Sequence, residues 1–147
     1  ITPSIRPENL LKVKESIDFD YINEWIVVYD GHRVEENPFL FSGEKKVREF
    51  ICKWQGDTGN PQRNFGLDQI REEKTYVYFL DDDNAIHPSL YRLLDVAEWE
   101  RIYTFDQENG LLGHQIVKDR IDTAMFLVDF SICMDVRWAS FCHAADY

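Results

Sequence analysis

Three consecutive aspartates, Asp81, Asp82 and Asp83, follow directly after the apolar run formed by residues 76–80. In an extended segment, side chains alternate in direction, so Asp81 and Asp83 would point one way and Asp82 the other. Two carboxylates about 5 Å apart repel each other by roughly 3 kcal/mol at an effective dielectric constant of 20. A divalent cation reverses the sign of that interaction, and Mg²⁺ or Mn²⁺ bridging to substrate phosphates suits such oxygen ligands. The aspartates therefore predict either a cation site or a solvated acidic turn.

Two other metal loops can be compared with the same stretch. A calcium-binding EF-hand loop that starts at Asp81 needs glycine at its sixth position and glutamate at its twelfth, where this chain has Ile86 and Arg92. A phosphotransferase of the haloacid-dehalogenase type also carries Asp-x-Asp after a strand. It usually has threonine or valine where this chain has Ala85, and its motif lies near the start of the chain. The EF-hand is excluded, and the phosphotransferase, with Asp81 as nucleophile, stays an alternative.

The elements that must position these aspartates alternate between helix-like and strand-like, which is typical of an α/β fold. We expect helices over residues 4–17, 59–73 and 88–99, and strands at the N-terminus and over residues 24–31, 47–54, 75–80, 101–107, 110–117 and 123–130. Asn60 is the expected N-cap of the second helix, with Pro61 at its first position. Asn109-Gly110 predicts a hairpin between the two strands that flank it.

Ligand sites in such folds lie beyond the carboxyl ends of the strands. Asp30, at the end of the strand over residues 24–31, and the three aspartates after residue 80 both occupy positions of that kind. We therefore expect these acidic side chains to share one site.

Length, composition and net charge limit the classes of protein to which this chain can belong. The chain has 147 residues, of which 44% are hydrophobic, enough for a single domain with a real core. We expect one domain, 1–147, truncated at both ends, because the chain starts like the end of a strand and stops like the start of a helix. A net charge of −11 argues against a nucleic acid or an anionic membrane as partner. No apolar run reaches the ~18 residues of a membrane span, and no secretory leader is present.

The cysteines favour a reducing compartment. Cys52, Cys133 and Cys142 are widely spaced and form no Cys-x-x-Cys pair. The chain also has no N-glycosylation sequon. Both observations favour a cytoplasmic protein, while a lumenal placement as part of a longer protein stays open.

Four stretches appear in a fixed order: ITPSIRP, EWIVVYDG, GNPQRNFGLDQI and YVYFLDDDN. Together they resemble the GT-A nucleotide-sugar glycosyltransferases, in particular the β-1,3-glucuronyltransferase-like group. A short viral or bacterial glycosyltransferase domain of this type also fits. The resemblance covers about residues 1 to 90 and is weaker beyond. It implies a Rossmann-like GT-A fold, with a mixed central sheet flanked by helices.

The resemblance also implies roles for individual residues. Asp83 would bind Mn²⁺ or Mg²⁺ directly, with Asp81 beside it. The other implied contacts are with a nucleotide: Thr2, Pro3 and Ser4 around its pocket, Asp30 at the uracil or ribose, Arg63 near the base and the acidic block, Arg6 at the diphosphate, and Asp81 and Asp82 at the ribose or metal-bound water.

For catalysis, the resemblance places Asp122 at the acceptor sugar and Asp146 as the base, although the family group uses glutamate there. The family's C-terminal basic residues have no counterpart in this chain. The implied reaction is the inverting, metal-dependent transfer of a sugar from a UDP-sugar donor to a saccharide or glycan acceptor. The alternatives are the phosphohydrolase or phosphotransferase described above and a non-catalytic nucleotide- or glycan-binding module.

Overall fold

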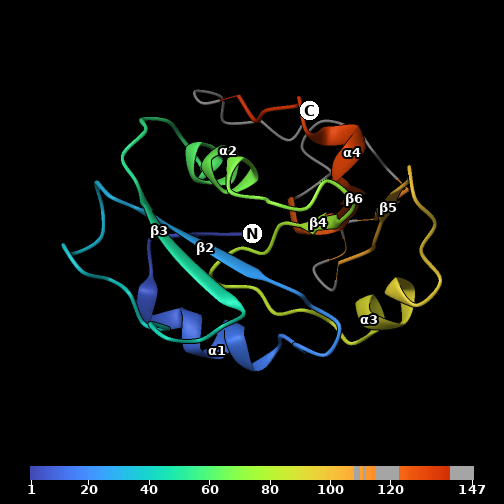
Figure 1. The fold of residues 1–147 in the computed structure, drawn as a ribbon, viewed down its shortest axis with the longest axis horizontal. Coiled ribbons are helices and arrows are strands. Elements are labelled where there is room, and N and C mark those ends of the chain that lie inside the picture. Colours follow the sequence, from blue (N-terminus) through green and yellow to red (C-terminus); the bar gives the residue numbers. More distant parts are fainter. Residues whose placement is uncertain (108–109, 111, 115–122, 140–147) are drawn as a thin grey trace.

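Two three-stranded sheets lie side by side in the middle of the molecule (Figure 1). The structure is a computed structural model, and it describes residues 1–107, 110, 112–114 and 123–139. The first sheet is parallel, with the strand order β1 (Thr2–Ser4), β2 (Trp25–Asp30), β3 (Val47–Cys52). The second is antiparallel, with the order β4 (Tyr76–Tyr78), β6 (Phe126–Asp129), β5 (Ile102–Thr104).

The two sheets meet at Ile1. Its amine donates a hydrogen bond to the Tyr78 carbonyl oxygen at 2.8 Å, and the Leu80 N–H donates to the Ile1 carbonyl oxygen at 3.0 Å. This is the pattern of parallel neighbours. The chain that leaves β4 therefore runs in the same direction as β1 and β2, and the carboxyl ends of all three lie at one edge.

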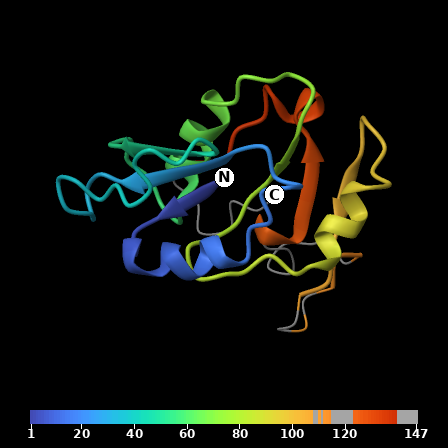
Figure 2. The same cartoon turned by 60° about the horizontal axis from the view of Figure 1, so that its bottom comes forward.

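Helices cover both faces of the first sheet. In Figure 1, α2 (Asn60–Asp68) lies on one side of β2 and β3, and α1 (Leu10–Glu15), which follows a 3₁₀ turn at Pro7–Asn9, lies on the other. The remaining helical segments are α3 (Ser89–Leu94), a 3₁₀ turn at Thr123–Met125 and the short α4 (Phe130–Cys133). In the view turned by 60°, β6 is seen as an orange-red arrow beside the yellow α3 (Figure 2).

The sequence of β2 explains why it is covered on both faces. Its first five residues are all buried, and alternate side chains point to opposite faces. Those of one face share a buried cluster with α1: Leu10, Val13, Trp25, Val27 and Tyr29. Those of the other face pack with a residue of β3 and one of α2: Ile26, Val28, Cys52 and Phe65. The run therefore forms a central strand rather than a half-exposed one.

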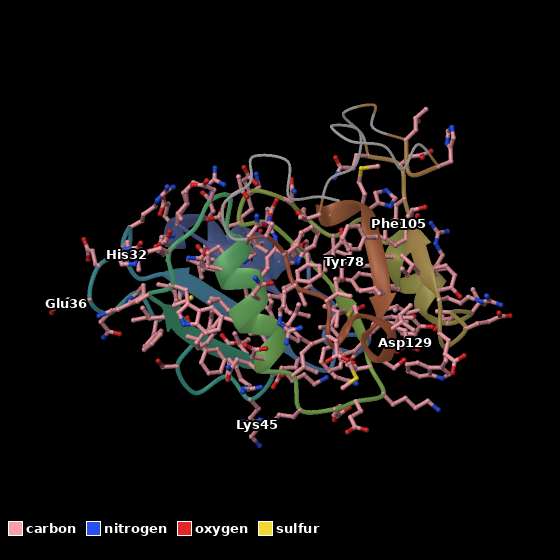
Figure 3. All side chains as sticks on the ribbon, turned by 90° about the horizontal axis from the view of Figure 1, so that it is seen from above. His32, Glu36, Lys45, Tyr78, Phe105 and Asp129 are labelled. Carbon is pink, nitrogen blue, oxygen red and sulfur yellow. The ribbon has the colours of Figure 1, made fainter. Side chains whose placement is uncertain are left out.

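Different elements form the two ends of the molecule. Figure 3 shows His32 and Glu36, on the loop that follows β2, at one end, and Tyr78, Phe105 and Asp129, on and beside the second sheet, toward the other. The rings of Tyr78 and Phe105 pack edge to face, with their centroids 6.3 Å apart.

Most of the predicted elements are confirmed, and three details are wrong. The N-cap of α2 is Gly59, not Asn60, which is the first helical residue. Residues 110 and 112–114, which were predicted to be in a strand, form none, and β5 pairs with β6; Asn109, Leu111 and residues 115–117 lie outside the described residues, so the rest of the hairpin stays a prediction. The aspartates are not extended, because the Asn84 N–H bonds the Asp81 carbonyl oxygen at 3.1 Å and closes a turn.

No helix in the described part of the chain has the length and apolar character needed to span a bilayer.

Candidate functional site

A cavity of about 260 Å³ lies where β1, β2 and the chain after β4 end. This is the edge at which ligands of open α/β sheets bind. Its walls come from the ends of these strands, from the loop before α2 and from the first turns of that helix: Pro3, Ser4, Ile5, Arg6, Asp30, Arg33, Gly56, Thr58, Gly59, Gln62, Arg63, Asp81, Asp82 and Asp83. Asp30 and the three aspartates therefore do share one site.

Asp82 anchors the end of β1. Its Oδ2 atom accepts hydrogen bonds from the Ser4 hydroxyl at 3.2 Å and from the backbone N–H groups of Ile5 and Arg6, both at 2.9 Å. Its Oδ1 atom accepts from the Arg6 guanidinium. The residue is only 3% exposed. Its oxygens are thus used to hold residues 4–6 in place.

Arg6 connects Asp82 to Asp83. Besides its bonds to Asp82, its Nη2 atom lies 3.0 Å from Asp83 Oδ2. The hydrogen bond to Asp82, which outweighs partial burial, raises the pKa of Arg6 above its usual value, and the charges of both aspartates act in the same direction. Asp83 is exposed, so one of its neighbours is solvent.

Arg63 connects α2 to Asp81. Its Nη2 atom donates to Asp81 Oδ1 at 2.6 Å and to the Thr123 hydroxyl at 3.2 Å. Its Nη1 atom donates to the Thr58 carbonyl oxygen at 2.6 Å and to Asn60 Oδ1 at 3.1 Å. The Nε atom is buried and has no hydrogen-bond partner among the described residues. The side chain lines the cavity and is 4% exposed, so most of this guanidinium is buried in the wall.

The loop before α2 is shaped by two left-handed residues. Thr58 has φ = +57° and Gly59 has φ = +78°. A Cβ atom on Gly59 would lie 3.0 Å from the Pro3 Cβ atom. The close contact explains why glycine is needed here, and it fixes the loop against the end of β1.

Helix α2 also holds the segment that leads to the C-terminus. The Asn64 side chain accepts from the Trp138 N–H at 2.8 Å and donates to the Trp138 carbonyl oxygen at 2.9 Å. Asn60 donates to the Ala139 carbonyl oxygen at 3.0 Å, and the Arg63 guanidinium lies over the Trp138 ring at 5.8 Å. Ala139 is therefore held at Asn60, which lies one helical turn before Arg63 on α2.

Most of the predicted nucleotide and metal residues line the cavity: Pro3, Ser4, Arg6, Asp30, Arg63, Asp81, Asp82 and Asp83. Thr2 does not. It is fully buried, and its hydroxyl accepts a hydrogen bond from Trp25 Nε1 at 2.8 Å. Asp122 and Asp146 lie outside the described residues, although Thr123, the neighbour of Asp122, bonds both Arg63 and Asp81.

Among the described residues, three further residues that line the cavity, Ile5, Gly56 and Gly59, were missed at the level of sequence, as were four with polar side chains at the site: Arg33, Thr58, Gln62 and Thr123. Arg33 lies three residues after Asp30, and its Nε atom is 3.6 Å from Asp30 Oδ2. The spacing was a visible signal for this pair. Thr123 carried no signal, because it is 42 residues from its partner Asp81.

The cavity offers only a small number of acidic ligands for a metal ion. Among the residues that the structure describes, no group of three or more His, Cys, Asp and Glu side chains is arranged to hold a metal ion. Asp81 and Asp83 line the cavity and are the more exposed pair of the three aspartates. Mg²⁺ typically takes one or two carboxylates and completes its shell with water and substrate phosphates.

A second cavity, of about 460 Å³, lies by the residues at which β2 and β4 begin. Its walls are mainly apolar and aromatic, including Trp25, Tyr76 and Leu90. This cavity is larger and has four charged residues on its walls, Glu24, Arg71, Glu72 and Lys74, but it lies where the strands begin rather than at their carboxyl ends. We therefore take the smaller cavity as the functional site.

Comparison with known proteins identifies a shared fold. No protein-family model matches the chain, and no curated protein matches it significantly. Among solved structures, S. aureus TarS residues 1–349 matches with a TM-score of 0.64 and 13% sequence identity. TarS is a wall teichoic acid glycosyltransferase. The match covers 99% of this chain and 51% of the TarS chain, so this chain spans about half of that structure and has a mixed α/β fold seen in a glycosyltransferase.

Proposed function

We propose that this chain forms the nucleotide-sugar site of an inverting, divalent-metal-dependent glycosyltransferase with the GT-A fold. It would transfer a sugar from a UDP-sugar donor to a saccharide or glycan hydroxyl. The observation that carries the proposal is the cavity at the strand ends, where three aspartates and two arginines converge. The fold shared with TarS supports glycosyl transfer in general.

The residues around the cavity have distinct parts in this proposal. Arg6 and Arg63 offer guanidinium groups to the diphosphate and the base, and Asp30 offers a carboxylate to the uracil or ribose. Asp83 and Asp81 would hold Mn²⁺ or Mg²⁺, which stabilises negative charge on a departing diphosphate. Asp82 holds residues 4–6 and keeps Arg6 aimed at the cavity.

The chemical step follows from a single displacement. The acceptor hydroxyl attacks the anomeric carbon from the face opposite the diphosphate, which inverts the configuration. Asp122 would orient the acceptor, and the carboxylate of Asp146 would take the hydroxyl proton as the new bond forms. The roles of these two residues rest on the sequence resemblance.

Calorimetric titration of UDP into the protein, with and without Mn²⁺, tests the proposal. We expect UDP to bind more tightly with Mn²⁺, and Asp83→Ala to remove the gain that the metal provides. Asp95→Ala, which neutralises an exposed acid away from the cavity, is the matched control and should behave like the wild type. If Asp83→Ala binds UDP like the wild type under both conditions, the proposed metal site is wrong.

A further inference from the structure

We propose that Arg6 is a displaceable occupant of the cation site, which competes with a divalent cation for Asp83. This inference rests on the proposed function, because it concerns how the same site loads. In the absence of the cation, the Arg6 guanidinium supplies the positive charge that Asp83 requires. When the cation binds, Asp83 exchanges one partner for the other, and Arg6 stays anchored on Asp82.

Arg6 binds Asp82 more strongly than it binds Asp83. Toward Asp82, Arg6 uses Nε at 2.9 Å, Nη2 and its backbone N–H at 2.9 Å, and the carboxylate that accepts them is 3% exposed. Toward Asp83, it makes a single contact at 3.0 Å with a side chain that is 51% exposed. Two guanidinium N–H groups on a buried carboxylate oxygen bind more strongly than a single contact with an exposed carboxylate. The contact between Arg6 and Asp83 is therefore the one that breaks when a cation binds.

The charges around the cavity explain why an internal cation is needed. Four carboxylates and three guanidinium groups line it, which leaves a net charge of −1: Asp30, Asp81, Asp82 and Asp83 against Arg6, Arg33 and Arg63. Without Arg6, the net charge would be −2, and the adjacent carboxylates would repel each other more strongly. The arginine thus stabilises the empty site.

A second observation concerns the other buried arginine of the cavity. The Arg63 side chain lines the cavity and is 4% exposed, and its Nε atom is buried without a partner in the described part of the chain. A buried unsatisfied donor costs about 1–3 kcal/mol of stability, so Arg63 is held in the site at a cost, beside the Asp81 carboxylate to which its Nη2 atom donates at 2.6 Å.

Cation and diphosphate binding should consequently favour each other. A cation on Asp83 would release the Nη2 side of Arg6 from that carboxylate, and the released group can donate to a phosphate oxygen. By linkage, a diphosphate that draws Arg6 away from Asp83 would increase the affinity for the cation by the same factor. The free protein would then bind the cation weakly.

The test is calorimetric titration of Mn²⁺ alone, followed by UDP at saturating Mn²⁺, into the wild type and Arg6→Ala. We expect Arg6→Ala to bind Mn²⁺ alone about tenfold more tightly, the order expected when a unit charge is removed beside a doubly charged ion at high dielectric. It should bind UDP about tenfold more weakly, because a charge-assisted donor is lost. These opposite changes exclude a merely structural role, which would weaken both.

Arg137→Ala is the matched control. It also removes one positive charge, but its partner Asp68 lies on the surface and neither residue lines the cavity. Both affinities should equal those of the wild type. Arg6→Lys, which keeps the charge but lacks the Nε donor and the planar guanidinium, should bind Mn²⁺ with intermediate affinity and covers the case in which Arg6→Ala fails to fold.

The outcomes separate this inference from the proposed function. If the wild type and both Arg6 variants bind Mn²⁺ equally while Mn²⁺ still promotes UDP binding, the competition is wrong and the nucleotide site stands. If neither the wild type nor the variants bind Mn²⁺ with or without UDP, the metal-dependent function is wrong as well.

Discussion

At the scale of single residues, the three aspartates have different environments. Asp82 is buried and accepts hydrogen bonds from residues 4–6, whereas Asp81 and Asp83 face the cavity. The turn that starts at Asp81 produces this division. Asp82 therefore stabilises the end of β1, and Asp83 is available to a ligand.

This division predicts different effects of the same substitution. Asp82→Asn should lower the free energy of unfolding by about 2–3 kcal/mol, because the amide leaves buried donors unsatisfied and the Arg6 charge without its closest partner. Asp83→Asn removes one solvated contact and should change stability by no more than about 0.5 kcal/mol. Urea unfolding of the two variants measures both effects. Equal losses would contradict the structural role of Asp82.

The sequence predicts the acids and arginines of the site better than their partners. Asp30, Asp81, Asp82 and Asp83 follow apolar runs that must be buried, so their place at the strand ends could be predicted. Thr2 also lies in the short first strand, but its hydroxyl is buried and accepts a hydrogen bond from the Trp25 indole. Such a contact depends on packing between strands and has no local signal.

At the scale of elements, the loop before α2 determines how close that helix lies to β1. Gly59→Ala should lower the free energy of unfolding by about 2 kcal/mol, since it adds a contact with Pro3 to the strain of a positive φ. It should also weaken UDP binding, because Arg63 lies one helical turn after Gly59 and would shift with the start of α2. Thermal unfolding and calorimetry measure the two effects.

Gly43 provides the control for this prediction. Its φ is +94°, but a Cβ atom there would meet nothing within 4 Å. Gly43→Ala should therefore show only the backbone cost, about 1 kcal/mol, with UDP binding unchanged. If Gly59→Ala and Gly43→Ala lower the free energy of unfolding equally, the contact between residue 59 and Pro3 does not contribute to stability.

Asp129 links the end of β6 to the start of β5. Its carboxylate accepts from the Ser131 N–H and hydroxyl, which caps α4, and from the N–H of Glu100, which has φ = +60°. Burial opposes ionisation, but these hydrogen bonds outweigh it and lower the pKa of Asp129. The ionised side chain thus stabilises the second sheet.

The lowered pKa predicts a pH dependence. Because the folded pKa lies below the unfolded value of about 3.9, the contribution of Asp129 is complete above that value and is lost as the pH falls through the folded pKa. The difference in unfolding free energy between the wild type and Asp129→Asn should therefore be largest near pH 7 and shrink below about pH 4. Denaturant unfolding across this range measures it. A difference that does not change with pH would contradict the account.

Elements were predictable where burial and local signals agree. The apolar run in β2 and the proline at the start of α2 both indicate their elements directly. The Asn109-Gly110 signal did predict a turn, since the Gly110 N–H bonds the Gln107 carbonyl oxygen at 3.0 Å. The pairing of β5 with β6 could not be predicted, because these strands lie far apart in the sequence and their pairing has no local signal.

At the scale of the whole molecule, the site depends on the parallel alignment of β1, β2 and the chain after β4. The hydrogen bonds of Ile1 align the two sheets, and this alignment brings residues 4–6, 30 and 81–83 to one edge. The general rule for α/β sheets predicts the edge. The order in which the two sheets join could not be derived from the sequence, because it depends on pairing between distant segments.

A crystal structure of the protein with UDP and Mn²⁺ tests the central claim most directly. The account predicts a diphosphate beside Arg6, the base near Arg63 and the cation on Asp83, in the cavity of about 260 Å³. Nucleotide density in the larger apolar cavity beside Trp25 and Tyr76, or none in either cavity at saturating UDP, would contradict it.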